Sequence, residues 1–122
     1  MDEYKICKIG NSKFWYLHDD HHRVDGPAIE FHDGSTEWWV NGECHREDGP
    51  ACEYTDGTKK WFVNGKRHRE DGPAIVYANG RKAWWINGVE VPEYKFMKKS
   101  KTKKFTAAEI ASLKSYGIEI KG

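Results

Sequence analysis

The sequence lacks the usual marks of a membrane or disulfide-stabilised protein. No apolar run approaches the roughly 20 residues that a membrane-spanning helix needs, and the opening residues MDEYKICKIG do not resemble a signal peptide. The three cysteines are odd in number and have no CxxC spacing, so neither a zinc site nor a disulfide framework is indicated. We therefore expect a cytoplasmic protein without membrane insertion, metal or cofactor.

Apolar residues are also scarce, but large aromatic rings are not. Hydrophobic residues make up 38% of the 122 residues, below the roughly 45–50% of an average globular domain. The six tryptophans and an aromatic share of 14% argue against disorder, because these rings bury large areas. The composition predicts one thin or elongated folded domain whose packing is rich in aromatic residues.

Charge is unevenly distributed along the chain. Residues 1–94 hold twelve Lys or Arg and seventeen Asp or Glu, a net charge of −5. Residues 95–104, KFMKKSKTKK, hold six Lys and no acid. An acidic body is thus followed by a short basic segment, which is a candidate for phosphate contacts.

One heptapeptide recurs at a fixed interval. HREDGPA stands at 45–51 and again at 68–74, and HRVDGPA stands at 22–28, so the spacing is 23 residues in both cases. A period of 20–50 residues is typical of repeat architectures. We divide the chain into a half unit followed by three full units, with the bounds 8–21, 22–44, 45–67 and 68–90.

Each full unit carries two hairpin signals. Asp-Gly or Asn-Gly at 33–34, 56–57 and 79–80 separates two β-prone runs, and Asn-Gly at 41–42, 64–65 and 87–88 follows the second run. Both dipeptides favour two-residue type I′ turns. The predicted fold is mainly β, an antiparallel meander of 23-residue hairpins in one elongated sheet.

A two-residue turn at 33–34 fixes a register. It places Ile29 opposite Trp38 and Ala28 opposite Trp39, so that Ile29 and Trp38 belong to the core face. The second face then carries a row of exposed rings at successive units, namely Tyr16, Trp39, Phe62 and Trp85. A turn longer by one residue exchanges the members of the two faces.

Two interpretations of the heptapeptide remain open. In the first it is a connection that each unit needs: the glycines at 26, 49 and 72 adopt positive φ, and each Asp pairs with the Arg two residues before it. In the second it presents a row of ligand-binding His and Arg side chains. The plain structural interpretation is the simpler one.

The run W-x-x-N-G-x-x-H, followed by Gly, a β-prone run and D/N-G, resembles the MORN repeat family. It stands here as WWVNGECHREDGPACEYTDG and WFVNGKRHREDGPAIVYANG. A typical MORN unit has a shorter connection than HREDGPA, and this H-R-x-D-G-P-A variant is similar to one in small proteins of tailed bacteriophages. The resemblance covers about residues 8–90. It implies a scaffold or binding surface, acting in the cytoplasm of a bacterial host.

The register that would give His-Arg gives Val91-Pro92, so the units end there and need a cap. We assign residues 1–92 to the β units, 93–105 to a Lys-rich connector and 106–122 to a short helix and tail. The helix is predicted over 106–116, TAAEIASLKSY, from the capping box formed by Thr106 and Glu109. Met97, Phe105 and this helix are expected to cover the last unit.

Catalysis and metal binding find little support. The repeated His, Arg and Asp are the same in every unit, whereas an active site needs one asymmetric set of groups. The cluster HDDHH at 18–22 offers metal-ligating side chains, but no further ligand stands at a known spacing. We expect no enzyme activity.

Two binding functions are left. The first is protein binding or self-association through the sheet face. The phage resemblance implies a host protein or defence component as the partner, and inhibition of that component as the result. Its candidate residues are Tyr16, Trp39, Phe62, Trp85, His45, Arg46, His68 and Arg69. The alternative is binding or sequestration of a nucleotide or nucleic acid through the same His, Arg and ring side chains, aided by phosphate contacts from the basic segment. The candidates for these contacts are Lys98, Lys99, Lys101, Lys103 and Lys104.

Overall fold

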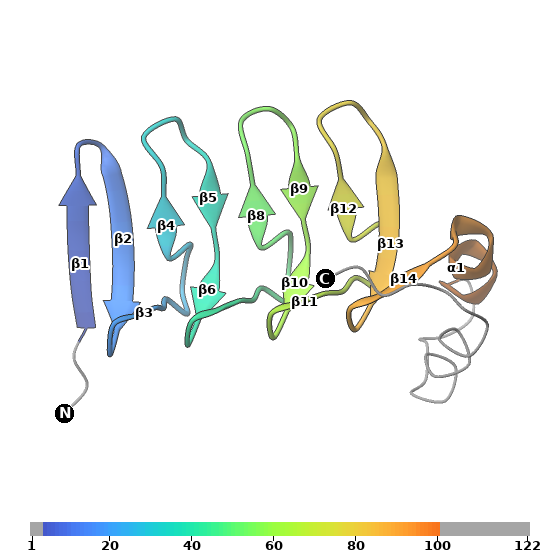
Figure 1. The fold of residues 1–122 in the computed structure, drawn as a ribbon, viewed down its shortest axis with the longest axis horizontal. Coiled ribbons are helices and arrows are strands. Elements are labelled where there is room, and N and C mark those ends of the chain that lie inside the picture. Colours follow the sequence, from blue (N-terminus) through green and yellow to red (C-terminus); the bar gives the residue numbers. More distant parts are fainter. Residues whose placement is uncertain (1–3, 101–122) are drawn as a thin grey trace.

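The protein is a row of antiparallel hairpins joined side by side into one long sheet (Figure 1). The computed structural model describes residues 4–100, with side chains to residue 97. The large sheet has ten strands: nine follow the order β1-β2-β4-β5-β8-β9-β12-β13-β14, and the tenth, β3, pairs with β2 off this path. The predicted fold class, a mainly β antiparallel meander followed by one short helix, is confirmed.

The first hairpin has the longest strands. β1 (Tyr4–Ile9) and β2 (Ser12–Leu17) pair along six residues each. The other strands of the large sheet are β3 (Asp20–His21), β4 (Ile29–Glu30), β5 (Thr36–Glu37), β8 (Cys52–Glu53), β9 (Lys59–Lys60), β12 (Ile75–Val76), β13 (Lys82–Ile86) and β14 (Val89–Val91).

Two small ladders lie beside the large sheet. They are formed by β6 (Trp39–Val40) with β7 (Glu43–Cys44) and by β10 (Phe62–Val63) with β11 (Lys66–Arg67). Each closes on an Asn-Gly turn in which both residues have positive φ, as at Asn41 (50°) and Gly42 (79°). Such angles define the type I′ turn that matches the twist of the strands. The predicted turns at 41–42, 64–65 and 87–88 are therefore confirmed.

The loops at 33–34, 56–57 and 79–80 differ from the prediction. The amide of Phe31 donates to the carbonyl of Ser35 (2.9 Å), and the amide of Gly34 donates to the carbonyl of Phe31 (3.0 Å). Three residues therefore lie in the loop, and only Gly34 has positive φ (95°). The predicted two-residue turn was wrong because a type I turn followed by a left-handed glycine is used here.

The longer loop shifts the register by one position. Ile29 lies opposite Glu37, not opposite Trp38 as predicted. Ile29 thus shares a face with Glu37, and the Nε1 of Trp39 donates to the Glu37 carboxylate (3.0 Å) from that face. As a consequence, Trp39 lies on the face of Ile29, where Trp38 was predicted, and Trp38 lies on the other face.

The core is thin along the units and thickens at the C-terminal end. In each full unit a small alanine and its neighbour are buried, namely Ala28 with Ile29, Ala51 with Cys52, and Ala74 with Ile75. At the end of the row a larger cluster gathers Trp84, Ile86, Val89, Val91 and Phe96. Phe96 comes from helix α1 (Glu93–Ser100), so the helix closes the last unit.

Helix α1 corrects the predicted cap. The first eight residues of the predicted Lys-rich connector are helical, and the helix starts after Pro92, whose carbonyl accepts the amides of Lys95 and Phe96. Phe96 is 1% exposed, whereas Met97, the predicted contact, is 42% exposed. Phe105 and the helix predicted over 106–116 lie outside the described residues. Within residues 4–100, no helix has the length and apolar character to span a bilayer.

Candidate functional site: the heptapeptide loops and the grooves between them

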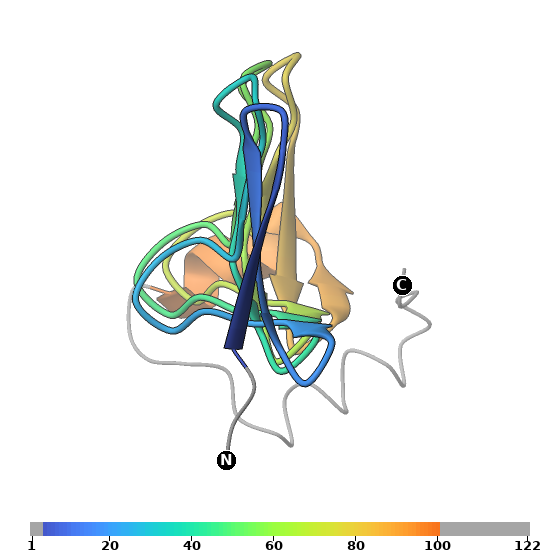
Figure 2. The ribbon, with the colours of Figure 1, turned by 90° about the vertical axis from the view of Figure 1, so that its left-hand side faces the viewer.

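The three heptapeptides form loops that project from the same side of the sheet. We call them the heptapeptide loops, with the bounds 22–28, 45–51 and 68–74. Viewed along the row, they lie one behind another to one side of the strands (Figure 2). The side of the sheet that carries them is called the loop face below.

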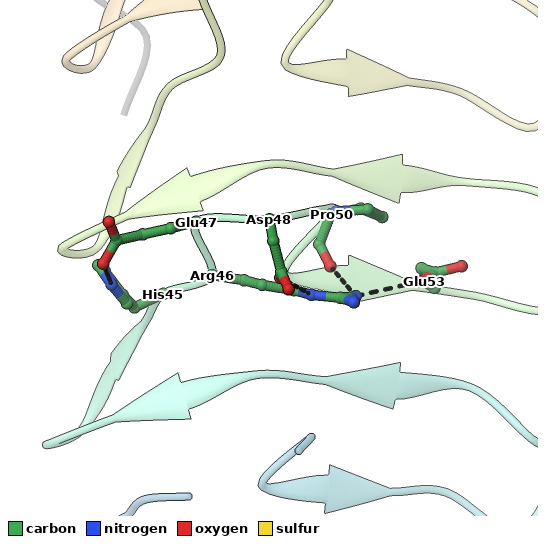
Figure 3. A network of polar contacts seen from close by, with 6 residues as sticks. All are labelled: His45, Arg46, Glu47, Asp48, Pro50 and Glu53. Carbon is green, nitrogen blue, oxygen red and sulfur yellow. Dashed lines mark hydrogen bonds and ion pairs between the residues drawn. The ribbon is translucent and has the colours of Figure 1, made fainter. Parts of the chain in front are cut away.

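Each loop is organised around its arginine. In the second loop the Arg46 Nε donates to Asp48 Oδ1 (2.9 Å), and its Nη1 donates to the carbonyl of Pro50 (3.1 Å) and to Glu53 Oε1 (3.5 Å) (Figure 3). Arg23 makes the same three contacts in the first loop. Arg69 makes the first two, because Val76 stands where the other units have Glu. The predicted Arg–Asp pairing is confirmed in all three loops.

The guanidinium groups also stack on tryptophan. Arg23 lies 4.1 Å above the ring of Trp15, and the equivalent distance is 4.0 Å from Arg46 to Trp38 and 3.9 Å from Arg69 to Trp61. A cation at this distance is attracted to the electron-rich ring face. Trp38 was predicted to lie in the core, but Trp38 and its equivalent Trp61 are both half-buried beneath an arginine. Trp61 also packs against the buried cluster of Ala74, Ile75 and Trp85.

The loop glycines make room for these arginines, which the sequence did not predict. Positive φ was predicted at residues 26, 49 and 72, but none of the three has it. Instead, a Cβ on Gly72 would lie 2.7 Å from the Arg69 Cζ, and one on Gly26 would lie 2.8 Å from the Arg23 Cζ. Each arginine is therefore held between a tryptophan ring and a glycine, and the absent side chain makes the space for it.

The histidines tie neighbouring units together. The Nδ1 of His45 accepts the backbone amide of Asn64, 19 residues further on (2.9 Å), and its Nε2 lies 3.1 Å from Glu47 Oε2. His22 and His68 accept the amides of Asn41 and Asn87 at the same distance. An accepting Nδ1 carries no proton, so the neutral Nε2–H tautomer fits this arrangement. These histidines have a structural role at the next Asn-Gly turn.

Grooves separate successive loops. One groove of about 650 Å³ lies between the second and third loops, with Trp61 and Val63 among its lining residues. A second groove, of about 430 Å³, lies between the first and second loops and has Trp38 and Val40 in the equivalent positions. Four predicted partner-binding residues line these grooves, namely His45, Arg46, His68 and Arg69.

The accessible charge in the grooves is acidic. Two arginines and four carboxylates line the larger groove, a net charge of −2 with neutral histidine, whereas two arginines and two carboxylates line the smaller groove and cancel. In both grooves it is the carboxylates that are exposed, with 81% of Glu47 accessible. The arginine side chains are shielded, with 21% of Arg46 exposed, whereas 82% of its partner Asp48 is exposed. The guanidinium groups are used inside the loops. The carboxylates are what a ligand meets.

The predicted ring residues lie apart from these grooves. Tyr16 stacks on His21 at 4.7 Å, and His21 lies 5.5 Å from the ring of Trp39. Tyr16, Trp39 and Phe62 are half-buried. Trp85 was predicted to be exposed but is only 3% exposed, and the Arg67 guanidinium lies 4.9 Å from its ring. The four rings therefore do not form one open ladder.

The phosphate-contact candidates are only partly described. The backbone of Lys98 and Lys99 belongs to α1, whereas Lys101, Lys103 and Lys104 lie outside the described residues. The basic segment therefore contributes no described contact to the grooves.

The cysteines lie in different environments. Cys7 is exposed on β1, whereas Cys52 is buried in the position that Ile29 and Ile75 hold in the other units. A hydrogen bond with Cys52, together with burial, raises the pKa of the Cys44 thiol. Within residues 4–100, no three His, Cys, Asp or Glu side chains gather as a metal site would require, the HDDHH cluster included.

Comparisons with protein-family models, with characterised proteins and with solved structures gave no match. The MORN-like assignment is therefore carried by the sequence motif alone, and the function has to be argued from the loop face.

Proposed function

We propose that this protein is a non-enzymatic interaction module that binds a protein partner along the loop face. The observation that carries the proposal is the pair of equivalent grooves, in which Trp38 and Val40 recur as Trp61 and Val63. Interface cores are enriched in aromatic residues and in arginine. A partner that fits one groove finds the same surface again in the next.

The contacts of the repeated loop side chains support binding over catalysis. His45 is engaged through both ring nitrogens, and Arg46 is engaged with Asp48, Pro50 and Trp38. A catalytic base or nucleophile needs to reach a substrate within hydrogen-bond distance. The loop His and Arg side chains make the same internal contacts in every loop. They therefore shape the surface and are not available as catalytic groups.

The same contacts weigh against the alternative, a nucleotide or nucleic-acid ligand. Phosphate binding relies on accessible Lys and Arg, which release counterions from the phosphate chain. On the loop face the arginines are shielded and the carboxylates exposed, so an approaching phosphate meets charge of its own sign. On the basis of the resemblance to small bacteriophage proteins, we propose a protein of the bacterial host as the partner.

The proposal is tested by affinity purification of the tagged protein from bacterial lysate, with and without nuclease, followed by native mass spectrometry. Two variants assign the surface: Val63→Lys alters a groove, and Trp39→Ala alters the ring-bearing side. We expect a partner that resists nuclease and is lost with Val63→Lys but kept with Trp39→Ala. The opposite pattern moves the interface to the rings, and loss with nuclease replaces the protein partner by nucleic acid. The melting temperature of each variant shows whether it is folded.

A further inference from the structure

The spacing of the grooves sets the geometry of what can occupy them. Successive units are two strands apart in the sheet order, as β5 pairs with β8 and β9 with β12. Neighbouring strands lie about 4.8 Å apart, so equivalent points recur at roughly 9.6 Å along the row. Figure 1 shows the hairpins following one another along the long axis of the molecule. A ligand that uses more than one groove must repeat its contacts at this interval.

A polyproline II helix has nearly this repeat. It contains three residues per turn with a rise of about 3.1 Å each, so every third side chain returns to the same side after roughly 9.3 Å. A β-strand does not fit as well, because side chains three positions apart point to opposite faces. Because one turn of the polyproline II helix is about as long as one unit of the sheet, every third side chain of the helix can enter the next groove.

The groove floor is of the kind that such helices use. Polyproline II segments dock in grooves lined by aromatic side chains, because the preformed helix loses little entropy on binding. Here the half-buried rings of Trp38 and Trp61 recur in successive grooves, with Val40 and Val63 beside them.

The charge of the grooves selects the sign of the ligand. Glu47 lines both grooves and is 81% exposed, and its Oε2 lies 3.1 Å from the Nε2 of His45. Asp48 and Asp71 present one oxygen to their arginine and remain largely exposed. Carboxylates at a fixed interval along an apolar floor complement Lys or Arg at the same interval.

We propose that the grooves bind a polyproline II segment of a partner protein that carries Lys or Arg at every third position. This inference rests on the proposed function, because it requires the loop face to be a protein-binding surface. The basic side chains contact the carboxylates of successive loops, and the residues between them cover Trp38 and Trp61.

The probe is a fluorescent peptide in which Pro-Pro-Arg is repeated four times, with a control peptide of the same composition in which the arginines are contiguous. Binding is measured by fluorescence polarisation against the full chain. We expect the periodic peptide to bind about tenfold more tightly than the control. Equal affinity of the two peptides overturns the inference, because net charge alone then accounts for binding.

Two charge reversals of the same size locate the contact. Glu47→Lys lies in both grooves, whereas Glu43→Lys lies on β7 and lines neither. We expect Glu47→Lys to weaken the periodic peptide about tenfold and Glu43→Lys to leave it nearly unchanged. Equal losses in the two variants overturn the inference, and so does tighter binding of an oligothymidine probe than of the peptide.

A competition experiment separates this inference from the proposed function. The partner recovered from lysate is challenged with the periodic peptide. Displacement of the partner supports the inference. A partner that is lost with Val63→Lys but is not displaced by the peptide overturns it, and leaves the proposed function standing.

Discussion

The guanidinium carbon of Arg69 lies 3.9 Å from the ring centroid of Trp61, and it fills the space that a side chain on residue 72 would need. The first and second loops contain the same pair of contacts. This arrangement explains why the heptapeptide keeps its glycine without using positive φ. It also leads to a prediction that separates crowding from backbone strain.

Gly72→Ala should destabilise the fold through Arg69. The new Cβ would lie 2.7 Å from the Arg69 Cζ, so the arginine must leave its place on Trp61. We expect a loss of about 1–2 kcal/mol, measured by urea unfolding, because the stacking and the hydrogen bonds of the guanidinium are disturbed. In an Arg69→Ala background the same change should cost much less.

Gly57→Ala is the matched control for this cycle. Gly57 has a φ of 98° and nothing within 4 Å of its Cβ position, so its cost comes from the backbone alone. A penalty of about 1–2 kcal/mol should remain whether or not Arg69 is present. If Gly72→Ala costs the same in both backgrounds, the arginine is not the cause.

His68→Ala should lower stability by removing the acceptor for the amide of Asn87. The Nδ1 of His68 accepts that amide at 2.9 Å, and its loss should cost about 1–2 kcal/mol. His32→Ala is the control, since His32 is exposed in the loop. Heteronuclear NMR should show the Nε2–H tautomer for His22, His45 and His68 at neutral pH. An Nδ1–H signal from any of these would contradict the hydrogen bond.

Stability should fall in acid through Asp33 and Asp56. The amide of Ser35 donates to Asp33 Oδ1 at 2.8 Å, and this hydrogen bond lowers the pKa of Asp33. The hydrogen bond from Thr58 lowers the pKa of Asp56 in the same way. A depressed folded-state pKa gives stability that is present above the unfolded value of about 3.9 and is lost as pH falls through the folded value.

The third unit supplies the control for this pH dependence. Asn79 accepts the amide of Arg81 at 3.0 Å without a titrating group. Asp33→Asn with Asp56→Asn should therefore keep the loops and flatten the stability curve between about pH 2 and 5. Thermal unfolding across this range, with wild type in parallel, is the measurement. If the double variant and the wild type show the same slope of stability against pH, the two carboxylates do not cause the loss of stability in acid.

The three thiols should react in a fixed order with iodoacetamide. Cys7 is exposed, whereas the hydrogen bond with Cys52 and burial raise the pKa of Cys44. The same hydrogen bond lowers the pKa of Cys52, but that thiol is only 3% exposed, so burial keeps the reagent away from it. Because the thiolate is the reactive form, we expect a single alkylation at Cys7 before either of the others. Peptide mapping by mass spectrometry identifies the site. Simultaneous modification of Cys44 would argue against its protected setting.

Phe96→Ala should be the most damaging change in helix α1. Phe96 is buried against Trp84, with ring centroids 6.3 Å apart, and its truncation should cost about 3–5 kcal/mol. The neighbouring Met97→Ala removes a side chain that is 42% exposed and should change stability little. Similar midpoints for the two variants in chemical unfolding would show that the helix does not close the last unit.

Local turn chemistry was predictable where one dipeptide decides the conformation. Asn41-Gly42 needs positive φ at both residues and has few alternatives, so the turn and its register followed from the sequence. Asp33-Gly34 leaves a choice, because the Asp side chain can instead bind the Ser35 amide within a three-residue loop. The one extra residue in this loop shifts the register and places Trp38 on the loop face. The aromatic floor of the grooves was therefore not predicted.

The site was only partly predictable for a similar reason. The recurrence of His45 and Arg46 marked the loops, and the Arg–Asp pairing followed from their spacing. The stacking of Arg46 on Trp38 depends on the register, and so does the burial of Trp85. One signal was available: a tryptophan stands eight residues before each arginine, as Trp38 does before Arg46.

The hydrogen bonds between neighbouring units bear on how the chain folds. His45 and Asn64 are 19 residues apart, and Ser35 and Thr55 are 20 apart. The entropy of closing a chain segment depends on its length, so each new unit meets nearly the same closure cost as the one before it. Because these contacts join only neighbouring units, folding can start at any unit and spread to the next one. Folding time should then depend little on how many units the row contains.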